Sequence, residues 1–302
     1  MVANIPTPLF PEPAASVNGR NVTLSVYVNQ PREVARDFAQ LYSAYSFLGR
    51  LLPDSGATSG GAVKYYPNDP DVNAGIEEVE EVAPGAELPE YGGKVGAPQV
   101  AEVNTWGHKI IIPKQSLKRN DVRLYNRLVR GATMSLDRKF RKQALAVISA
   151  RLNQDNRYIT AAADWSSFTV ETATPTAPKL RPEGAIDAAL SVFDADDQGQ
   201  RPTLLIMNPA DWLLFVQGYG RKRAMDVLAA YGLEPVSNSA QPAHKALLAV
   251  EGQLGGTYWE EPLTVDPWEN KQIRSQQIDL EGSPAFAVDN TPAGLEIRGI
   301  SV

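Results

Sequence analysis

Near the N-terminus the hydrophobic pattern alternates with a period of two. Between residues 21 and 28 the apolar positions are Val22, Leu24, Val26 and Val28. This alternation predicts a strand with one buried face. No second strand follows directly, so its pairing partner has to come from far along the chain or from another chain. From Pro31 onward, apolar residues recur at helical spacing, which predicts a helix over residues 31–53 that Gly49 and Pro53 end.

The middle of the chain predicts a strand followed by a very long helix. The strand runs through residues 110–112 and stops at Pro113. Asn120 or Asp121 then caps a helix over about residues 121–152. Its apolar stripe comprises Tyr125, Leu128, Val129, Ala132, Leu136, Phe140, Ala144, Val147, Ile148 and Leu152. Such a helix is a rod of roughly 48 Å at about 1.5 Å per residue, far longer than a typical globular helix.

The C-terminal part of the chain indicates a mixed α/β structure. Pro182 opens a helix whose apolar residues share one face, and TLLIM at residues 203–207 is a buried strand. Asn208 and Pro209 then form the N-cap and first turn of another helix, and a further helix ends at Gly232. Short strands are predicted at residues 246–250, 258–265, 285–288 and 295–300.

Residues 54–98 interrupt these patterns with a polar region rich in Gly, Pro and Glu. Nine acidic residues stand against Lys64 and Lys94, which gives a local charge of −7. The acidic residues are Asp54, Asp69, Asp71, Glu77, Glu78, Glu80, Glu81, Glu87 and Glu90. A hairpin of this length reaches at most about 70 Å, and a two-stranded hairpin is marginally stable in water without a further strand or packing surface. The region is therefore either disordered or completed by another surface.

The predicted long helix carries charge of the opposite sign. Eight basic residues stand against Asp121 and Asp137, a local charge of +6. The basic residues are Arg123, Arg127, Arg130, Arg138, Lys139, Arg141, Lys142 and Arg151. Two interpretations stay open. These side chains line the wet side of an amphipathic helix, or they contact phosphate groups without reading base sequence, because the aromatic residues typical of base recognition are missing.

Composition sets limits on the protein class. Over 302 residues, 43% are hydrophobic and 21% charged, as expected for a folded chain with one large domain or two smaller ones. A net charge of −6 gives no global reason to expect nucleic-acid or membrane binding, so any such binding is local. The chain has no cysteine, which excludes disulfides, thiolate metal sites and a cysteine nucleophile. The sequence shows no signal-peptide pattern and no apolar run long enough to cross a membrane.

Candidate catalytic chemistry is sparse. His108 and His244 are far apart in sequence, which is more typical of structural or exposed histidines than of metal ligands. No phosphate-binding glycine loop, nucleophile elbow or zinc-protease motif occurs. The glutamates between residues 77 and 81 suggest an acid–base pair or a calcium site, but the stretch lacks the apolar wall that a catalytic carboxyl needs, so a solvated acidic face is favoured. We therefore expect no enzyme activity, no catalytic residues, no metal and no cofactor.

Three local motifs occur in a fixed order along the chain. They are VAPGAELPE at residues 82–90, IIIPKQSLKRND at residues 110–121 and LLIMNPADW at residues 204–212. Each motif is weak by itself. Together with an extended arm, a helix, a long polar excursion, a strand, a very long helix and an α/β region, they resemble the major capsid proteins of tailed double-stranded DNA phages, which have the Hong Kong 97-like fold. The resemblance covers essentially the whole chain.

The resemblance implies an α+β fold with the parts of that family in chain order. These are an N-arm (1–30), a helix joining it to the P-domain (31–53), an E-loop (54–98), a P-domain (99–180) whose spine helix spans about 121–152, an A-domain (181–280) and C-terminal strands (281–302) that return to the body. In this family the E-loop lies across a neighbouring subunit. That subunit would supply the packing surface that the polar region lacks, and the N-arm strand would pair between subunits in the same way.

The resemblance also implies a function and a set of contact residues. The chain is expected to be a non-enzymatic subunit that self-assembles, as hexamers and pentamers, into the icosahedral shell of a virion around double-stranded DNA. The E-loop residues expected at subunit contacts are Glu77, Glu78, Glu80, Glu81, Glu87 and Glu90. The basic residues expected to face DNA or a neighbour are Arg123, Arg127, Arg130, Arg138, Lys139, Arg141 and Lys142. The candidates for a lysine–asparagine cross-link, which some family members form, are Lys64 and Lys94.

The partners implied are copies of the chain, packaged DNA bound without sequence preference, a portal, a scaffolding protein and a cement protein, with no membrane. A separate scaffolding protein is expected because the sequence starts with a proline-rich arm, where many members have a helical scaffolding segment. Assembly would take place in the bacterial cytoplasm. Two other interpretations stay open. An encapsulin-type nanocompartment subunit has the same fold but encloses no genome. The other interpretation is a soluble enzyme with an acidic site, a hydrolase, or a carbohydrate-binding module, and an enzyme would be a small species with a deep pocket.

Overall fold

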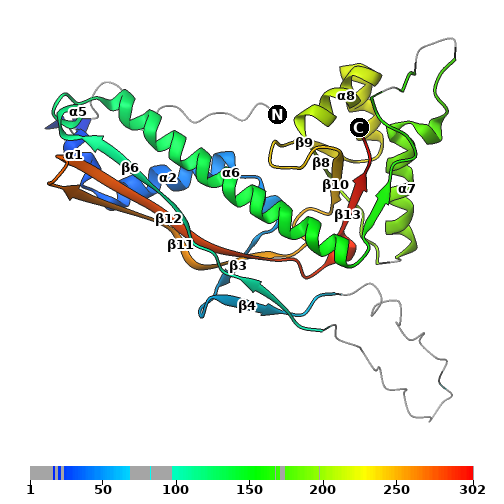
Figure 1. Cartoon of the computed structure of the whole chain (residues 1–302), viewed down its shortest axis with the longest axis horizontal. Coiled ribbons are helices and arrows are strands. Elements are labelled where there is room, and N and C mark those ends of the chain that lie inside the picture. Colours follow the sequence, from blue (N-terminus) through cyan, green and yellow to red (C-terminus); the bar gives the residue numbers. More distant parts are fainter. Residues whose placement is uncertain are drawn as a thin grey trace.

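One long helix, α6, dominates the elongated body that Figure 1 shows, and it runs from α5 at one end toward a second group of strands and helices at the other. The structure is a computed structural model. It describes residues 16–17, 20–21, 24–68, 82, 97–166, 168–170, 174–196 and 198–301. Most of the predicted N-arm and of the predicted E-loop therefore lies outside the described residues.

The predicted long helix is confirmed as α6 (Val122–Gln154). Of the two candidate caps, Asp121 is the N-cap, and its Oδ1 accepts a hydrogen bond from the Leu124 amide at 3.1 Å. The apolar stripe faces the body, where Tyr125 and Phe140 are fully buried. Because this stripe continues over the whole length, α6 is held by packing along its axis rather than by helix propensity alone.

The helix α6 contacts a four-stranded sheet with the strand order β3-β11-β12-β6. The strands are β3 (Asp54–Ala57), β6 (Trp106–Pro113), β11 (Gly256–Asn270) and β12 (Ser275–Ala287). Strand β6 confirms the predicted strand that stops at Pro113, and the short helix α5 (Lys114–Lys118) follows it directly. Strand β12 pairs antiparallel with both β11 and β6, while β3 pairs parallel with β11.

The long β11–β12 hairpin differs from the two short strands expected at residues 258–265 and 285–288. Its pairs run from Gly256 opposite Ala287 to Asn270 opposite Ser275. The expected A-domain boundary at residue 280 therefore falls inside a hairpin that joins the sheet beneath α6. Pro262 and Pro267 break the strand pattern in the sequence, although the structure accommodates Pro262 where the pairing register shifts.

A five-stranded sheet forms the second part of the body, with the order β7-β13-β10-β8-β9. Its strands are β7 (Tyr158–Thr160), β8 (Leu204–Met207), β9 (Glu234–Ser237), β10 (Lys245–Ala249) and β13 (Gly294–Arg298). The helices beside it are α7 (Pro182–Ala195), α8 (Pro209–Tyr219) and α9 (Arg221–Ala230), with short 3-10 turns η1 (Pro178–Leu180) and η2 (Thr291–Ala293). The prediction that Asn208 caps a helix is confirmed, because its Oδ1 accepts from the Ala210 amide at 3.0 Å.

The predicted strand over residues 21–28 is wrong. The structure has a two-residue pairing of β1 (Ser16–Val17) with β2 (Arg20–Asn21), followed by helix α1 (Leu24–Val28). Leu24 and Val28 are fully buried and Tyr27 is 9% exposed, whereas Val26 is 52% exposed. Burial at positions i, i+3 and i+4 is helical, and the alternation misled because Tyr27 counted as a polar position. The Leu24 amide is bound by Asn120 Oδ1 at 2.7 Å.

The helix predicted over residues 31–53 is divided into α2 (Pro31–Tyr45) and α3 (Leu48–Leu51). Ser46 has an extended backbone at the break, and its Oγ accepts a hydrogen bond from the Leu48 amide at 3.4 Å. A serine side chain that binds nearby backbone competes with helical hydrogen bonding. Gly49, predicted to end the helix, instead lies inside α3.

Aromatic packing joins these elements at the middle of α6. The Phe140 ring lies edge-on to three other rings, with centre-to-centre distances of 6.1 Å to Tyr42, 5.8 Å to Trp106 and 5.9 Å to Trp259. Those rings belong to α2, β6 and β11. Phe140 therefore holds one helix and two strands of the sheet on the same point of α6.

Candidate interaction surfaces

The base of the predicted E-loop is a small hairpin of β4 (Ala62–Tyr65) and β5 (Gln99–Glu102), paired antiparallel. Val63 and Ala101 pack onto Ala285 and Ala287 of β12. The preceding strand β3 pairs with β11. The expectation that all of residues 54–98 depend on another surface is therefore wrong for residues 54–65, which their own chain holds.

The acidic residues predicted to contact a neighbour, at positions 77, 78, 80, 81, 87 and 90, lie outside the described residues, as does Lys94. Lys64 is described and exposed on β4. Its ammonium lies 5.4 Å from the ring centre of Tyr66. Beyond β4 the chain touches its own body again, because Asn68 forms an isolated bridge with Asn290.

The turn between β3 and β4 is held by one carboxylate of β11. Glu260 Oε1 accepts hydrogen bonds from the amides of Gly60 and Gly61, at 3.1 and 3.0 Å. Both glycines have positive φ, +89° and +77°, a backbone region that other residues adopt with strain. The Thr58 amide also donates to the Trp259 carbonyl at 2.9 Å. We call this set of three hydrogen bonds the loop junction (the Gly60 and Gly61 amides with Glu260, and the Thr58 amide with the Trp259 carbonyl).

Most of the predicted basic residues of α6 are exposed, namely Arg123, Arg127, Arg138, Lys139 and Lys142. Four of these are separated by 4, 11 and 4 residues, which are close to whole numbers of turns, so they share one side of the helix over about 29 Å. We call these four the basic face (Arg123, Arg127, Arg138 and Lys142). Lys139 lies away from it, and its ammonium is 5.5 Å from the ring centre of Trp106.

Arg141 and Arg130 are half-buried, and Arg141 contacts side chains of its own chain. Arg141 Nη2 lies 2.6 Å from Asp137 Oδ2, and the Asp137 side chain has 0% exposure. Burial raises the pKa of the Asp137 carboxyl, while the charge of Arg141 lowers it. Arg141 Nη1 also donates to Asn238 Oδ1, beside the five-stranded sheet, at 3.4 Å. These contacts engage Arg141 within its own chain, and its expected contact with DNA or a neighbouring subunit stays a prediction.

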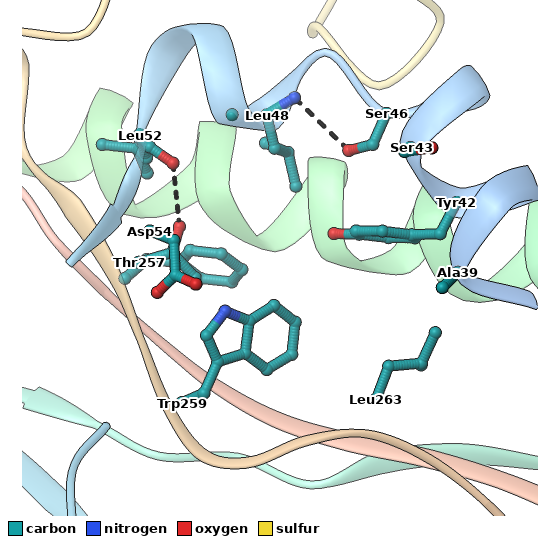
Figure 2. Close-up of a pocket in the computed structure, with 12 residues that line it drawn as sticks. Ala39, Tyr42, Ser43, Ser46, Leu48, Leu52, Asp54, Thr257, Trp259 and Leu263 are labelled. Atoms are coloured by element: carbon teal, nitrogen blue, oxygen red, sulfur yellow. Dashed lines mark hydrogen bonds between the residues drawn. The ribbon is translucent and has the colours of Figure 1, made fainter. Parts of the chain in front are cut away.

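An apolar groove of about 430 Å³ opens between α2, α3 and β11. Figure 2 shows Tyr42 of α2 facing Trp259 and Leu263 of β11 across it. All three side chains are half-buried. Thr257 closes one end, where its hydroxyl donates to the Leu52 carbonyl at 3.1 Å. Trp259 thus lines the groove with its ring and supplies the loop junction with its carbonyl.

A buried acid near the middle of α2 links this helix to α1. Asp37 is 2% exposed, and its Oδ2 accepts a hydrogen bond from the Tyr27 hydroxyl at 2.5 Å. The ring of Tyr27 lies 6.1 Å from that of Tyr125 on α6. Burial raises the pKa of Asp37 to about 6, because desolvation disfavours its charged form more than the hydrogen bond from Tyr27 favours it.

Comparison with known proteins identifies the family. A family model described as phage capsid protein matches residues 96–296, well over half of the chain. The chain belongs to this family. No curated protein sequence matches the capsid protein significantly.

Solved structures similar to the capsid protein include other shell proteins. A virus-like particle from Pyrococcus furiosus matches with a TM-score of 0.59 and 11% identity, covering 88% of the capsid protein and 98% of that chain. A phage-related protein from Bordetella bronchiseptica RB50 has a TM-score of 0.57 and 13% identity, with coverage of 88% and 96%. The capsid of cyanophage P-SCSP1u matches with a TM-score of 0.55 and 12% identity, covering 82% of the capsid protein and 87% of that chain. The predicted α+β, Hong Kong 97-like fold is confirmed.

One histidine of the capsid protein lies in the four-stranded sheet and the other beside the five-stranded sheet. His108 Nε2, on β6, is 2.9 Å from Ser135 Oγ of α6, and His244 Nδ1, just before β10, is 2.7 Å from Ser301 Oγ. Among the described residues, no three His, Cys, Asp or Glu side chains gather in a way that could hold a metal ion. Within the same residues, no helix has the length and apolarity to cross a membrane.

Proposed function

We propose that this capsid protein self-assembles, as hexamers and pentamers, into the icosahedral shell that encloses phage double-stranded DNA, without enzymatic activity. The observation that carries the proposal is the long polar segment between β4 and β5. Residues 66–98 depart from β4 and return at its neighbour β5, and their sequence is too polar to bury a core of its own. A packing surface on a second copy of the chain meets that need.

Opposite charges support such a contact between copies. The glutamates at positions 77, 78, 80, 81, 87 and 90 give the loop strong negative charge, while the exposed basic side chains of α6 are positive. Complementary charge guides association and suppresses wrong partners more than it adds affinity. We assign the loop glutamates to a neighbouring subunit.

The basic face is assigned to DNA. Its four charges stand on an otherwise acidic protein and extend over about 29 Å, so a phosphate backbone lying along α6 could meet several of them. Contacts of this kind read no sequence, which suits a shell that encloses a whole genome.

A deletion tests the shell. Residues 69–96 are replaced by a short Gly-Ser linker, which leaves β3, β4 and β5 and their contacts in place. The variant is expected to stay folded and soluble but to form no megadalton particles in electron microscopy, whereas the full chain forms them. Closed particles from the deleted chain would contradict the proposal.

An encapsulin-type nanocompartment is the second candidate, because the similar Pyrococcus furiosus structure is described as a virus-like particle. Particles purified from infected cells separate the two. Nuclease-protected DNA of defined length supports the virion shell, and particles filled with protein and free of DNA support the compartment.

The remaining partners are proposed on the same basis. The similar satellite phage P4 procapsid includes a size determination protein, which supports the expectation that a separate scaffolding protein directs assembly here. A portal and a cement protein complete the set, and assembly is assigned to the bacterial cytoplasm before release in the virion. Boiling mature particles in detergent tests the Lys64 and Lys94 cross-link. A single band at 32.8 kDa means that none forms.

A further inference from the structure

The direction in which the β4–β5 hairpin leaves the body depends on few contacts. Four pairs join β4 to β5, and the buried contacts of the hairpin with β12 are made by small side chains, Val63 and Ala101 against Ala285 and Ala287, with Tyr65 packed beside them. The bridge of Asn68 with Asn290 and the loop junction are further connections. There Glu260 binds the two amides of a Gly60–Gly61 turn that has no side chains to hold it.

Glu260 stands at an irregular point of β11. The pairing of β11 with β12 shifts in register between Trp259 and Glu261, so Glu260 is the extra residue of a bulge. A bulge re-aims the side chain that it carries. Neighbouring Trp259 packs its ring 5.9 Å from Phe140 of α6. Two successive residues therefore connect the turn at the loop base to the middle of α6.

We propose that Glu260 is the positioning residue that fixes the angle of the β4–β5 hairpin, and hence of the loop beyond it, relative to α6. One oxygen of its carboxylate accepts two hydrogen bonds, and charge-assisted bonds of this kind are about twice as strong as neutral ones. The significance for assembly rests on the proposed function, since the angle would set where a neighbouring copy meets the loop. The angle itself is a property of one chain.

A distance measurement within one chain tests this. The protein has no cysteine, so Val100→Cys on β5 with Met134→Cys on α6 places two spin labels uniquely, and both positions are exposed. Labelled chains are diluted with unlabelled ones so that only distances within a chain are observed. Glu260→Ala is expected to broaden the distance distribution, whereas Glu261→Gln, which removes a carboxylate at the next exposed position, leaves it as in the parent.

Hydrogen exchange gives a second readout at the junction. In Glu260→Ala the Gly60 and Gly61 amides are expected to lose about tenfold in protection, equivalent to about 1.4 kcal/mol. Glu260→Gln, which keeps an acceptor without the charge, is expected to fall in between. Glu260 is exposed, so unchanged far-UV circular dichroism is expected in every variant.

The proposal is overturned if Glu260→Ala leaves both the distance distribution and the exchange of the two glycines unchanged. It is equally overturned if Glu261→Gln has the same effect as Glu260→Ala. Neither result would bear on whether shells form, because both measurements concern a single chain. Loss of closed particles in Glu260→Ala, together with a broadened distance, would extend the role to assembly.

Discussion

Replacing Arg141 by Gln tests the assignment of this residue to the interior. In the protein its guanidinium neutralises the fully buried Asp137 carboxylate and donates to Asn238. Gln cannot supply a charge, so Arg141→Gln leaves an uncompensated acid inside the body. The expected consequence is loss of stability.

The size of the effect follows from burial. Removing one partner of a buried ion pair typically costs about 3–5 kcal/mol, and because Arg141 retains 21% exposure the lower end, about 3 kcal/mol, applies. The pKa of Asp137 is already raised by burial, and loss of Arg141 raises it further. A raised carboxyl pKa contributes stability at low pH that is lost as the pH rises through the folded value, so the deficit should shrink on acidification.

Thermal unfolding of dissociated subunits at fixed concentration measures this. Arg141→Gln is expected to lower Tm by roughly 5–10 °C at pH 7.5 and by less at pH 5. The double variant with Asp137→Asn removes the orphaned charge and should recover most of the loss. An Arg141→Gln protein with parental Tm at both pH values would refute the reasoning, as would a double variant less stable than the single one.

Three further predictions follow from buried and exposed charges and from the aromatic cluster. Asp37→Asn should flatten the pH dependence of Tm. The carboxyl, with its pKa raised to about 6, lowers the stability of the parent by at most about 3 kcal/mol as the pH rises from 4 to 7. An equal slope of Tm against pH in parent and variant would contradict this prediction. Phe140→Ala should lower the free energy of unfolding, measured in denaturant, by about 3–5 kcal/mol. A loss below about 1 kcal/mol would mean that the aromatic cluster around Phe140 contributes little to stability. Replacing Arg127, Arg138 and Lys142 by Gln should reduce the slope of log K against log salt for DNA by about 2.7, while the same three charges removed at residues 221–223 should leave that slope unchanged.

The parts of the fold that the sequence predicted well are those in which one long pattern decides the structure. The stripe of α6 repeats over nine turns with a capping aspartate at its start, and β8 with Asn208 combines an apolar run with a helix cap. In short segments the hydrophobic pattern does not distinguish a helix from a strand. In residues 24–28 a helix and a strand bury almost the same positions, and the amide at the start of the helix is bound by Asn120, which is far away in sequence.

The contacts at the candidate surfaces were harder to predict because they join distant segments. The spacing of Asp137 and Arg141, four residues apart on one helix, was a usable signal for an ion pair. Nothing in the sequence near Glu260 points to Gly60, since the two are brought together only by the pairing of β3 with β11. The strand on which Glu260 stands was predicted at residues 258–265, but the prolines of β11 concealed its full length.

The middle of α6 contacts both parts of the body. Phe140 fixes the four-stranded sheet through Trp259, and the next residue, Arg141, reaches Asn238 beside the five-stranded sheet. Glu260 follows Trp259 and holds the base of the loop. A neighbouring copy bound to the loop, as proposed, would therefore be oriented relative to α6 through the contacts of Phe140, Trp259 and Glu260. Because α6 also carries the basic face, the positions of neighbour and DNA would be set by one helix, and a change at residues 137–141 would disturb both.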